Sequence, residues 1–220
     1  MKTVATSPTG AQILASGDVE RVTILRDVLL ARAKEARRDI SSFINLVMRE
    51  EFTRKPIKTA PHQKLFLDFI LEHERSVVML PIGHSKTSSS AALTLKFLGE
   101  DPTTRGAIVS ATQGQAEKVV RMVRDYIEQP AELQLVYPRL MKSRRQGDPW
   151  TQTLLTVDRP PGIRDASLMA VGIDGKIEGS RLSWIIIDDI LTRENTNTKE
   201  ARDKVQDWVD ASVLSRLDPH

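Results

Sequence analysis

The hydrophobic and polar positions of the first part of the chain follow a helical period. From Asp18, a candidate N-cap, apolar side chains recur three and four residues apart as far as Leu30, which predicts a helix, and a second helix is predicted over about 40–52. Before them, residues 1–17 are rich in Ser, Thr, Gly and Ala with little to bury, which is typical of a disordered arm. The basic segment 53–60 contains proline and predicts a linker.

Beyond the linker, short apolar runs alternate with amphipathic segments. The runs predict β-strands over 76–80, 106–110, 153–157, 167–171 and 182–187. The amphipathic segments predict helices over 62–74, 87–97, 113–128 and 199–214. Apolar strands that lack polar alternation and are separated by helices are typical of a mostly parallel sheet covered on both faces. We therefore expect an α/β main domain over 61–220, preceded by a helical lead-in and linker over 18–60 and by the arm.

The composition narrows the class of protein. The chain has 220 residues, of which 40% are hydrophobic and 28% charged, as in ordinary soluble domains. No apolar run approaches the ~20 residues that a bilayer span requires, and the first residues lack the pattern of a secretory signal, so we expect no membrane partner. The absence of cysteine excludes disulfides and thiolate metal sites. Four scattered histidines lack the spacing of a metal site.

Charge is only a weak indicator of a nucleic-acid partner. The 32 basic and 29 acidic residues leave a net charge of +3, which is small for a protein that wraps nucleic acid. Four cations do cluster in a stretch that also contains glycine and proline: Arg139, Lys142, Arg144 and Arg145. This stretch is either a solvated loop or a contact with a phosphate backbone, and the sequence leaves both interpretations open.

The turn after the predicted strand 76–80 has the layout of a phosphate-binding loop. The strand is followed by a small-residue turn with Gly83, and then by Lys86 and Thr87 at the start of a helix. In such loops backbone N–H groups face an anion, the lysine reaches the outer phosphates and the hydroxyl binds Mg²⁺. The usual pattern would place glycine where Leu80 and Ser85 stand. The alternative is an ordinary strand-to-helix turn capped by Ser85 or Thr87.

Two acids follow the most apolar of the predicted strands. Asp188 and Asp189 come directly after 182–187. The carboxyl ends of the strands in an open α/β sheet converge beside the ligand, so such acids can hold Mg²⁺ and polarise the attacking water of a nucleotide hydrolase. Paired aspartates are also common turn formers and helix caps. The loop and the acidic strand occur in this order in a chain of alternating predicted strands and helices, and together they favour a nucleotide hydrolase.

A third motif lies just before the predicted helix that leads into the strand 76–80. The amide of Gln63, in Pro61-His62-Gln63, can donate to and accept from the edge of an adenine ring. The alternative is a helix start with proline in its first turn and an exposed glutamine.

Together these motifs resemble the large terminase subunit of tailed bacteriophages and prophages. The stretches that carry the likeness are collinear: Pro61 to Gln63, Pro81 to Thr87, Ala111 to Ala116, Ile177 to Leu182, Ile185 to Asp189 and Thr192 to Arg216. The resemblance implies a P-loop NTPase fold of the ASCE/RecA-like class with an N-terminal helical appendage. It also implies an ATPase motor that translocates double-stranded DNA into a procapsid.

The resemblance implies a role for each matching residue. Gln63 would read adenine. The loop would bind the phosphates of ATP through Pro81, Gly83, His84, Ser85, Lys86 and Thr87. Thr87 and Asp188 would hold Mg²⁺, and Asp189 or Glu194 would activate water. Arg181 would supply a cation to the γ-phosphate, in its own subunit or a neighbouring one, although it can equally be a surface residue before a strand.

The chain departs from the family pattern in two respects. Ile82 stands where the family has an arginine, and Ser85 where it has a second glycine, so a Cβ must fit beside the phosphate. The sequence also ends at His220, before the family's coupling motif and RNase H-like nuclease domain, so we expect no nuclease activity.

The resemblance also implies partners. They are double-stranded DNA, a portal protein, a small terminase subunit and further copies in a homo-oligomeric ring, in the cytoplasm of the host cell. The rival interpretations are another P-loop translocase, such as a helicase or recombination ATPase, and a degenerate P-loop module without catalysis.

Overall fold

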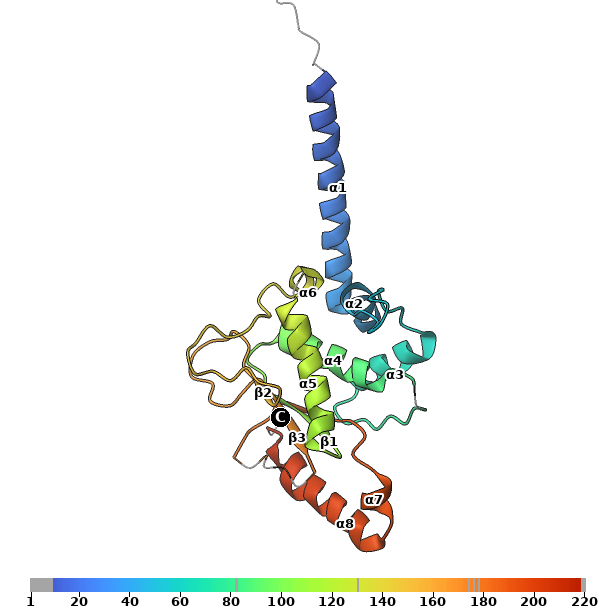
Figure 1. Ribbon diagram of the computed structural model, residues 1–220, viewed down its shortest axis with the longest axis vertical. Helices are drawn as coiled ribbons and strands as arrows, with labels where there is room; N and C mark the ends of the chain where they lie inside the picture. The colour runs from blue at the N-terminus through green and yellow to red at the C-terminus, as the bar shows by residue number, and fades with distance from the viewer. Residues whose placement is uncertain are drawn as a thin grey trace, which may run out of the picture.

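The computed structural model describes residues 10–81, 83–129, 131–173, 175, 177 and 179–218, with side chains from residue 21 onward. It consists of an open sheet flanked by helices and a long N-terminal helix that projects from this body (Figure 1). The helices are α1 (Gly10–Arg38), α2 (Ile40–Val47), α3 (Pro61–Glu72), α4 (Lys86–Glu100), α5 (Gln113–Glu128), α6 (Ala131–Val136), α7 (Arg193–Thr196) and α8 (Lys199–Trp208). A π-helical turn (Val209–Val213) and a 3₁₀ turn (Leu214–Arg216) follow α8.

The sheet has four strands in the order β2-β3-β1-β4. The strands are β1 (Gly106–Ser110), β2 (Leu154–Leu155), β3 (Leu168–Gly172) and β4 (Trp184–Ile187). The central strand β1 runs parallel to both β3 and β4, whereas the two-residue β2 is antiparallel to β3. The predicted α/β class is therefore confirmed as a mixed sheet with helices, and the sheet is only partly parallel.

Both faces of the sheet are covered. On one face, Ile108 and Ala170 pack in the main core with the helices α4 and α5 and the lead-in. On the other face, Ala107 and Val109 pack with Val213, which follows α8. Successive residues of β1 thus enter different cores, because side chains alternate across a strand. This arrangement explains why the strand is buried at every position.

The projecting helix α1 joins the body only through its C-terminal part, where Ala33 and Ala36 are buried. It begins at Gly10, so the disordered arm predicted for 1–17 is wrong for 10–17, and residues 1–9 lie outside the described chain. Ala11 and the residues after it are good helix formers, which outweighs the cap signal of Asp18. None of the described helices is long and apolar enough to cross a membrane.

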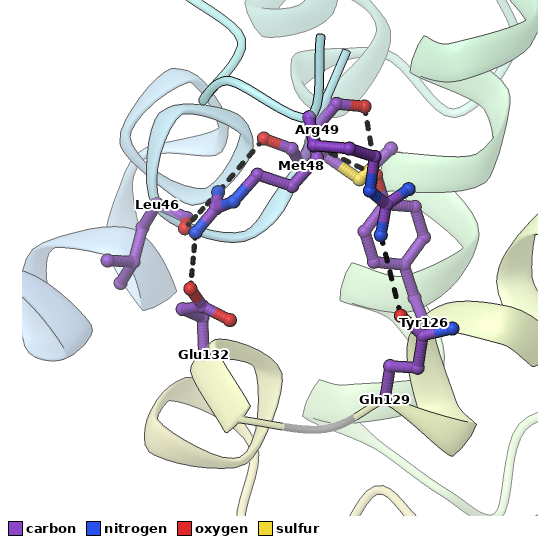
Figure 2. A network of polar contacts seen from close by, with 7 residues as sticks. Leu46, Met48, Arg49, Tyr126, Gln129 and Glu132 are labelled. Atoms are coloured by element: carbon purple, nitrogen blue, oxygen red, sulfur yellow. Dashed lines mark hydrogen bonds and ion pairs between the residues drawn. The ribbon is translucent and has the colours of Figure 1, made fainter. Parts of the chain in front are cut away.

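Arg49 attaches the lead-in to the α/β body (Figure 2). Its backbone N–H donates to the Tyr126 hydroxyl on α5 at 2.8 Å. Its guanidinium donates to the carbonyl oxygens of Leu46 and Met48, at 2.8 and 3.1 Å, and forms an ion pair with Glu132 on α6. Arg49 thereby satisfies carbonyls at the end of α2 and connects that end to the body, to α6 through its side chain and to α5 through its backbone.

The strand predicted over 76–80 is absent from the sheet. This segment is irregular, with Val77 and Met79 exposed at 88% and 91%. Among the described strands, β4 pairs only with β1, so its other edge has no strand partner and 76–80 joins no ladder. An apolar β-prone sequence does not form a strand without a hydrogen-bonding neighbour. The helix predicted over 199–214 is also too long, because α8 gives way to π and 3₁₀ turns after Trp208.

Candidate functional site

The turn before α4 exposes the amino end of that helix. Gly83 and Ser85 both have left-handed backbone conformations, with φ of 84° and 56°. Ser85 occupies the N-cap position, yet its side chain makes no capping hydrogen bond. The first N–H groups of the 15-residue helix α4 are therefore available to a ligand. A left-handed residue followed by helical ones forms a concave nest of N–H groups that suits an anion. Ile82 lies outside the described residues.

Asp188 and Asp189 lie at the carboxyl end of β4. The Asp188 N–H donates to the carbonyl of Val109 at 2.8 Å, and the Ala111 N–H donates to the carbonyl of Asp189 at 3.4 Å. These bonds continue the β1–β4 pairing past the strand and fix the acids beside the end of β1. Asp189 has φ of 48°, a conformation that aspartate tolerates better than most residues.

The loop and the acids meet, although about a hundred residues separate them in sequence. The Lys86 Nζ lies 3.5 Å from the Asp189 Oδ1 and donates to the Leu80 carbonyl at 3.2 Å. The Thr87 hydroxyl lowers the pKa of the Asp188 carboxyl as a hydrogen-bond donor, which indicates that the two side chains lie close together. The sequence predicted this proximity from motif spacing alone. Lys86, Thr87, Asp188 and Asp189 form what we call the loop–acid cluster.

The electrostatics of the cluster favour a bound cation. Burial raises the pKa of Asp188 above its ordinary value, and the neighbouring charge of Asp189 raises it further. The hydrogen bond from Thr87 and the charge of Lys86 oppose this rise only in part. The protein therefore disfavours the ionised form of Asp188, and a bound divalent cation would stabilise that form.

The oxygen ligands of the cluster fit Mg²⁺ bound with phosphate. Thr87, Asp188 and Asp189 offer a hydroxyl and two carboxylates, which are the hard ligands that Mg²⁺ prefers. No group of three or more His, Asp or Glu side chains in the described chain could hold a metal ion. A Mg²⁺ ion here would complete its shell with water and phosphate oxygens, as is usual for nucleotide sites.

The predicted adenine motif lies beside the loop. The rings of His62 and His84 meet edge-on with centroids 5.1 Å apart. Gln63 and Ser85 line one small cavity, together with apolar side chains of α2 and α3. At about 10 Å³ the cavity is too small for a purine, so adenine would have to lie across its mouth. The Gln63 Oε1 accepts from the Ala60 N–H at 2.8 Å, so in this state its carbonyl caps α3.

Two predicted catalytic residues are not brought to the loop–acid cluster. Arg181 precedes β4 and Asp188 follows it, so the whole length of this strand, about 13 Å, lies between the two residues. Its side chain is 74% exposed and its Nη1 lies 3.9 Å from the Asp218 carboxylate. Glu194 lies on the short helix α7, where it is exposed, and it makes no hydrogen bond or ion pair with the described residues of the cluster.

A supporting contact beside the cluster was not predicted. The Gln113 Nε2 donates to the Ala170 carbonyl at 3.1 Å, and the Gly172 N–H donates to the Gln113 Oε1 at 3.0 Å. A Cβ at Gly172 would lie 2.4 Å from the Gln113 nitrogen, so only glycine allows this approach. The sequence signal was the capping box of Thr112 and Gln115, which starts α5 directly after β1.

Comparisons with known proteins find no match for this chain, either among models of protein families or among curated proteins. The terminase resemblance therefore depends on the motifs and on the site geometry.

Proposed function

We propose that the chain is the ATPase motor domain of a viral terminase large subunit, with a P-loop NTPase fold. The observation that carries the proposal is the meeting of the loop before α4 with the acids after β4. The 3.5 Å contact between Lys86 and Asp189, together with the effect of the Thr87 hydroxyl on the pKa of Asp188, supports the joining of the two halves of a nucleotide site. A turn capped for structural reasons alone would not require a lysine and two acids to converge there.

In the proposed reaction the loop binds the phosphates of ATP. The N–H groups at the start of α4 bind the β- and γ-phosphates, and Lys86 exchanges its contact with Asp189 for the γ-phosphate. Thr87 and Asp188 would hold Mg²⁺, which when bound neutralises phosphate charge. The freed Asp189 accepts a proton from the attacking water as the bond between the γ-phosphorus and the bridging oxygen breaks. The products are ADP and inorganic phosphate.

The proposal includes the partners that the resemblance implies. ATP turnover would drive double-stranded DNA into a procapsid, with a portal protein, a small terminase subunit and a ring of identical chains in the host cytoplasm. Arg181 lies at the opposite end of β4 from the acids of its own chain. A role for it at the γ-phosphate would thus need donation to a neighbouring subunit, which stays a prediction.

A nucleotide-binding module without turnover is the main alternative. The position of Glu194 favours this alternative, because Glu194 makes no hydrogen bond or ion pair with the described residues of the loop–acid cluster. Among the described residues, Asp189 is then the only carboxylate beside Asp188. A different P-loop translocase, such as a helicase, would share the same cluster.

Phosphate release from Mg²⁺–ATP, measured with and without linear duplex DNA, tests the proposal. A motor releases phosphate, duplex DNA raises the rate, and Asp189→Asn lowers the rate more than it lowers ATP affinity. Binding of ATP without any release, at every DNA concentration, would favour the module. Absence of ATP binding would refute both.

A further inference from the structure

A polar pocket opens at the end of the sheet opposite to the loop–acid cluster. It has a volume of about 540 Å³. Its walls include Arg105, Asp165 and Arg181, which precede β1, β3 and β4, together with Arg164. The amino ends of three parallel strands thus bring these side chains together.

Among the described residues of this pocket, positive charge exceeds negative charge. Arg105 contacts two carboxylates, with nitrogen–oxygen distances of 3.6 Å to Asp165 and 2.7 Å to Asp218. Asp218 is also the partner of Arg181, at 3.9 Å. Arg164 is exposed and makes no hydrogen bond or ion pair with any described residue. In the part of the pocket that the structure describes, two carboxylates therefore neighbour three guanidinium groups.

Arg159 adds a fourth cation behind the pocket. Its Nη2 donates to the carbonyl oxygen of Asp165, while its Nη1 is buried and has no hydrogen-bond partner in the described chain. Burial lowers the pKa of Arg159, while the charges of Asp148 and Asp165 act against this effect and those of Arg105 and Arg145 add to it.

The backbone leaves room for a ligand to approach. Gly162 and Gly179, both in the pocket wall, have φ of 99° and 84°. An added Cβ would meet no described atom within 4 Å at either position. Their backbone N–H groups can therefore come close to a bound anion.

We propose that this pocket binds a phosphate group of a duplex DNA backbone. A diester phosphate fits the surplus of arginine, since a guanidinium can donate two parallel hydrogen bonds to it. The exposed position of Arg164 and Arg181 at the rim suits a polymer that passes over the surface better than an enclosed small ion. The choice of DNA as the source of the phosphate rests on the proposed function.

Fluorescence anisotropy with a short labelled duplex, without nucleotide, tests the pocket. The double variant Arg164→Ala/Arg181→Ala should weaken binding at least about tenfold at about 0.1 M salt. The reason is that each phosphate contact raises the affinity about eightfold when the salt concentration falls from about 1 M to about 0.1 M. The slope of log affinity against log salt should flatten by about 2. Arg21→Ala/Arg26→Ala removes the same charge from exposed positions on α1 and should leave the affinity within about twofold, as expected away from a contact.

Three results would overturn the inference. They are an unchanged affinity in the pocket variant, an equal loss in the α1 variant, and thermal stabilisation by inorganic phosphate that the pocket variant loses while its duplex affinity persists. The third would assign the pocket to a free phosphate. Because no nucleotide is present, failure here is separate from failure of ATP binding at Lys86.

Discussion

Lys86→Ala separates ligand binding by the phosphate loop from its structural role. In the free protein, Lys86 contacts Asp189 at 3.5 Å, and the two side chains are 30% and 66% exposed. An ion pair so open to solvent contributes at most about 1 kcal/mol. We therefore expect the melting temperature of the unliganded variant to stay within about 4 °C of the wild type, for a domain of about this size.

With ATP and Mg²⁺ the two proteins should differ. ATP at 100 times its dissociation constant stabilises the wild type by about 2.7 kcal/mol, which raises the melting temperature by about 5–11 °C. Loss of the charge-assisted contacts of Lys86 should cost about 3 kcal/mol, or roughly 100-fold in affinity. At the same ATP concentration the variant would gain only about 0.4 kcal/mol, or about 1–2 °C.

Thermal shift by calorimetry, with isothermal titration for the affinity, checks these values. Lys199→Ala is a matched control, because Lys199 also has a carboxylate partner, Asp203 at 2.6 Å on α8, but lies outside the loop. The control should keep the full ATP-dependent shift. An equal shift in Lys86→Ala and the wild type would refute the phosphate-loop assignment.

Four further substitutions test other parts of the account. Asp188→Asn should raise the melting temperature of the Mg²⁺-free protein at neutral pH, with a gain that shrinks toward acid pH, because the folded state raises the pKa of this carboxyl and loses stability as it ionises; a loss of stability would contradict this. Arg49→Ala should cost about 2 kcal/mol in urea unfolding and Glu132→Gln about 1 kcal/mol or less, since the glutamate side chain is 42% exposed; equal losses would argue against the carbonyl bonds as the main contribution. Gly106→Ala would place a Cβ 2.1 Å from the Trp184 ring and should destabilise by about 1–3 kcal/mol in the same assay, and full stability would show that the ring can move.

Elements with a complete local signal were predictable. The strand 106–110 and the helix 113–128 were predicted with the bounds that the structure has, since an apolar run, a Thr112 cap and a 3.6-residue period follow one another there. The segment 76–80 has equal β propensity, yet it forms no strand because no described neighbour pairs with it. Local pattern carries no information about which backbone lies alongside.

The candidate site was predictable in part for the same reason. The proximity of Lys86 and Asp189 was predicted from the order of the two motifs, although the strand 76–80 on which that reasoning relied does not form. The position of Arg181 at the other end of β4 depends on strand length and register. The arginine pocket joins residues that precede three different strands, and no spacing within the sequence marks it.

A crystal structure with Mg²⁺ and a non-hydrolysable ATP analogue tests the central claim most directly. The account predicts a Mg²⁺ ion about 2.1 Å from the Thr87 hydroxyl oxygen, with Asp188 in its first or second coordination shell. It also predicts the γ-phosphate on the N–H groups of 83–87, with Lys86 moved from Asp189 onto it. Nucleotide bound elsewhere, or no nucleotide at saturating concentration, would contradict the account.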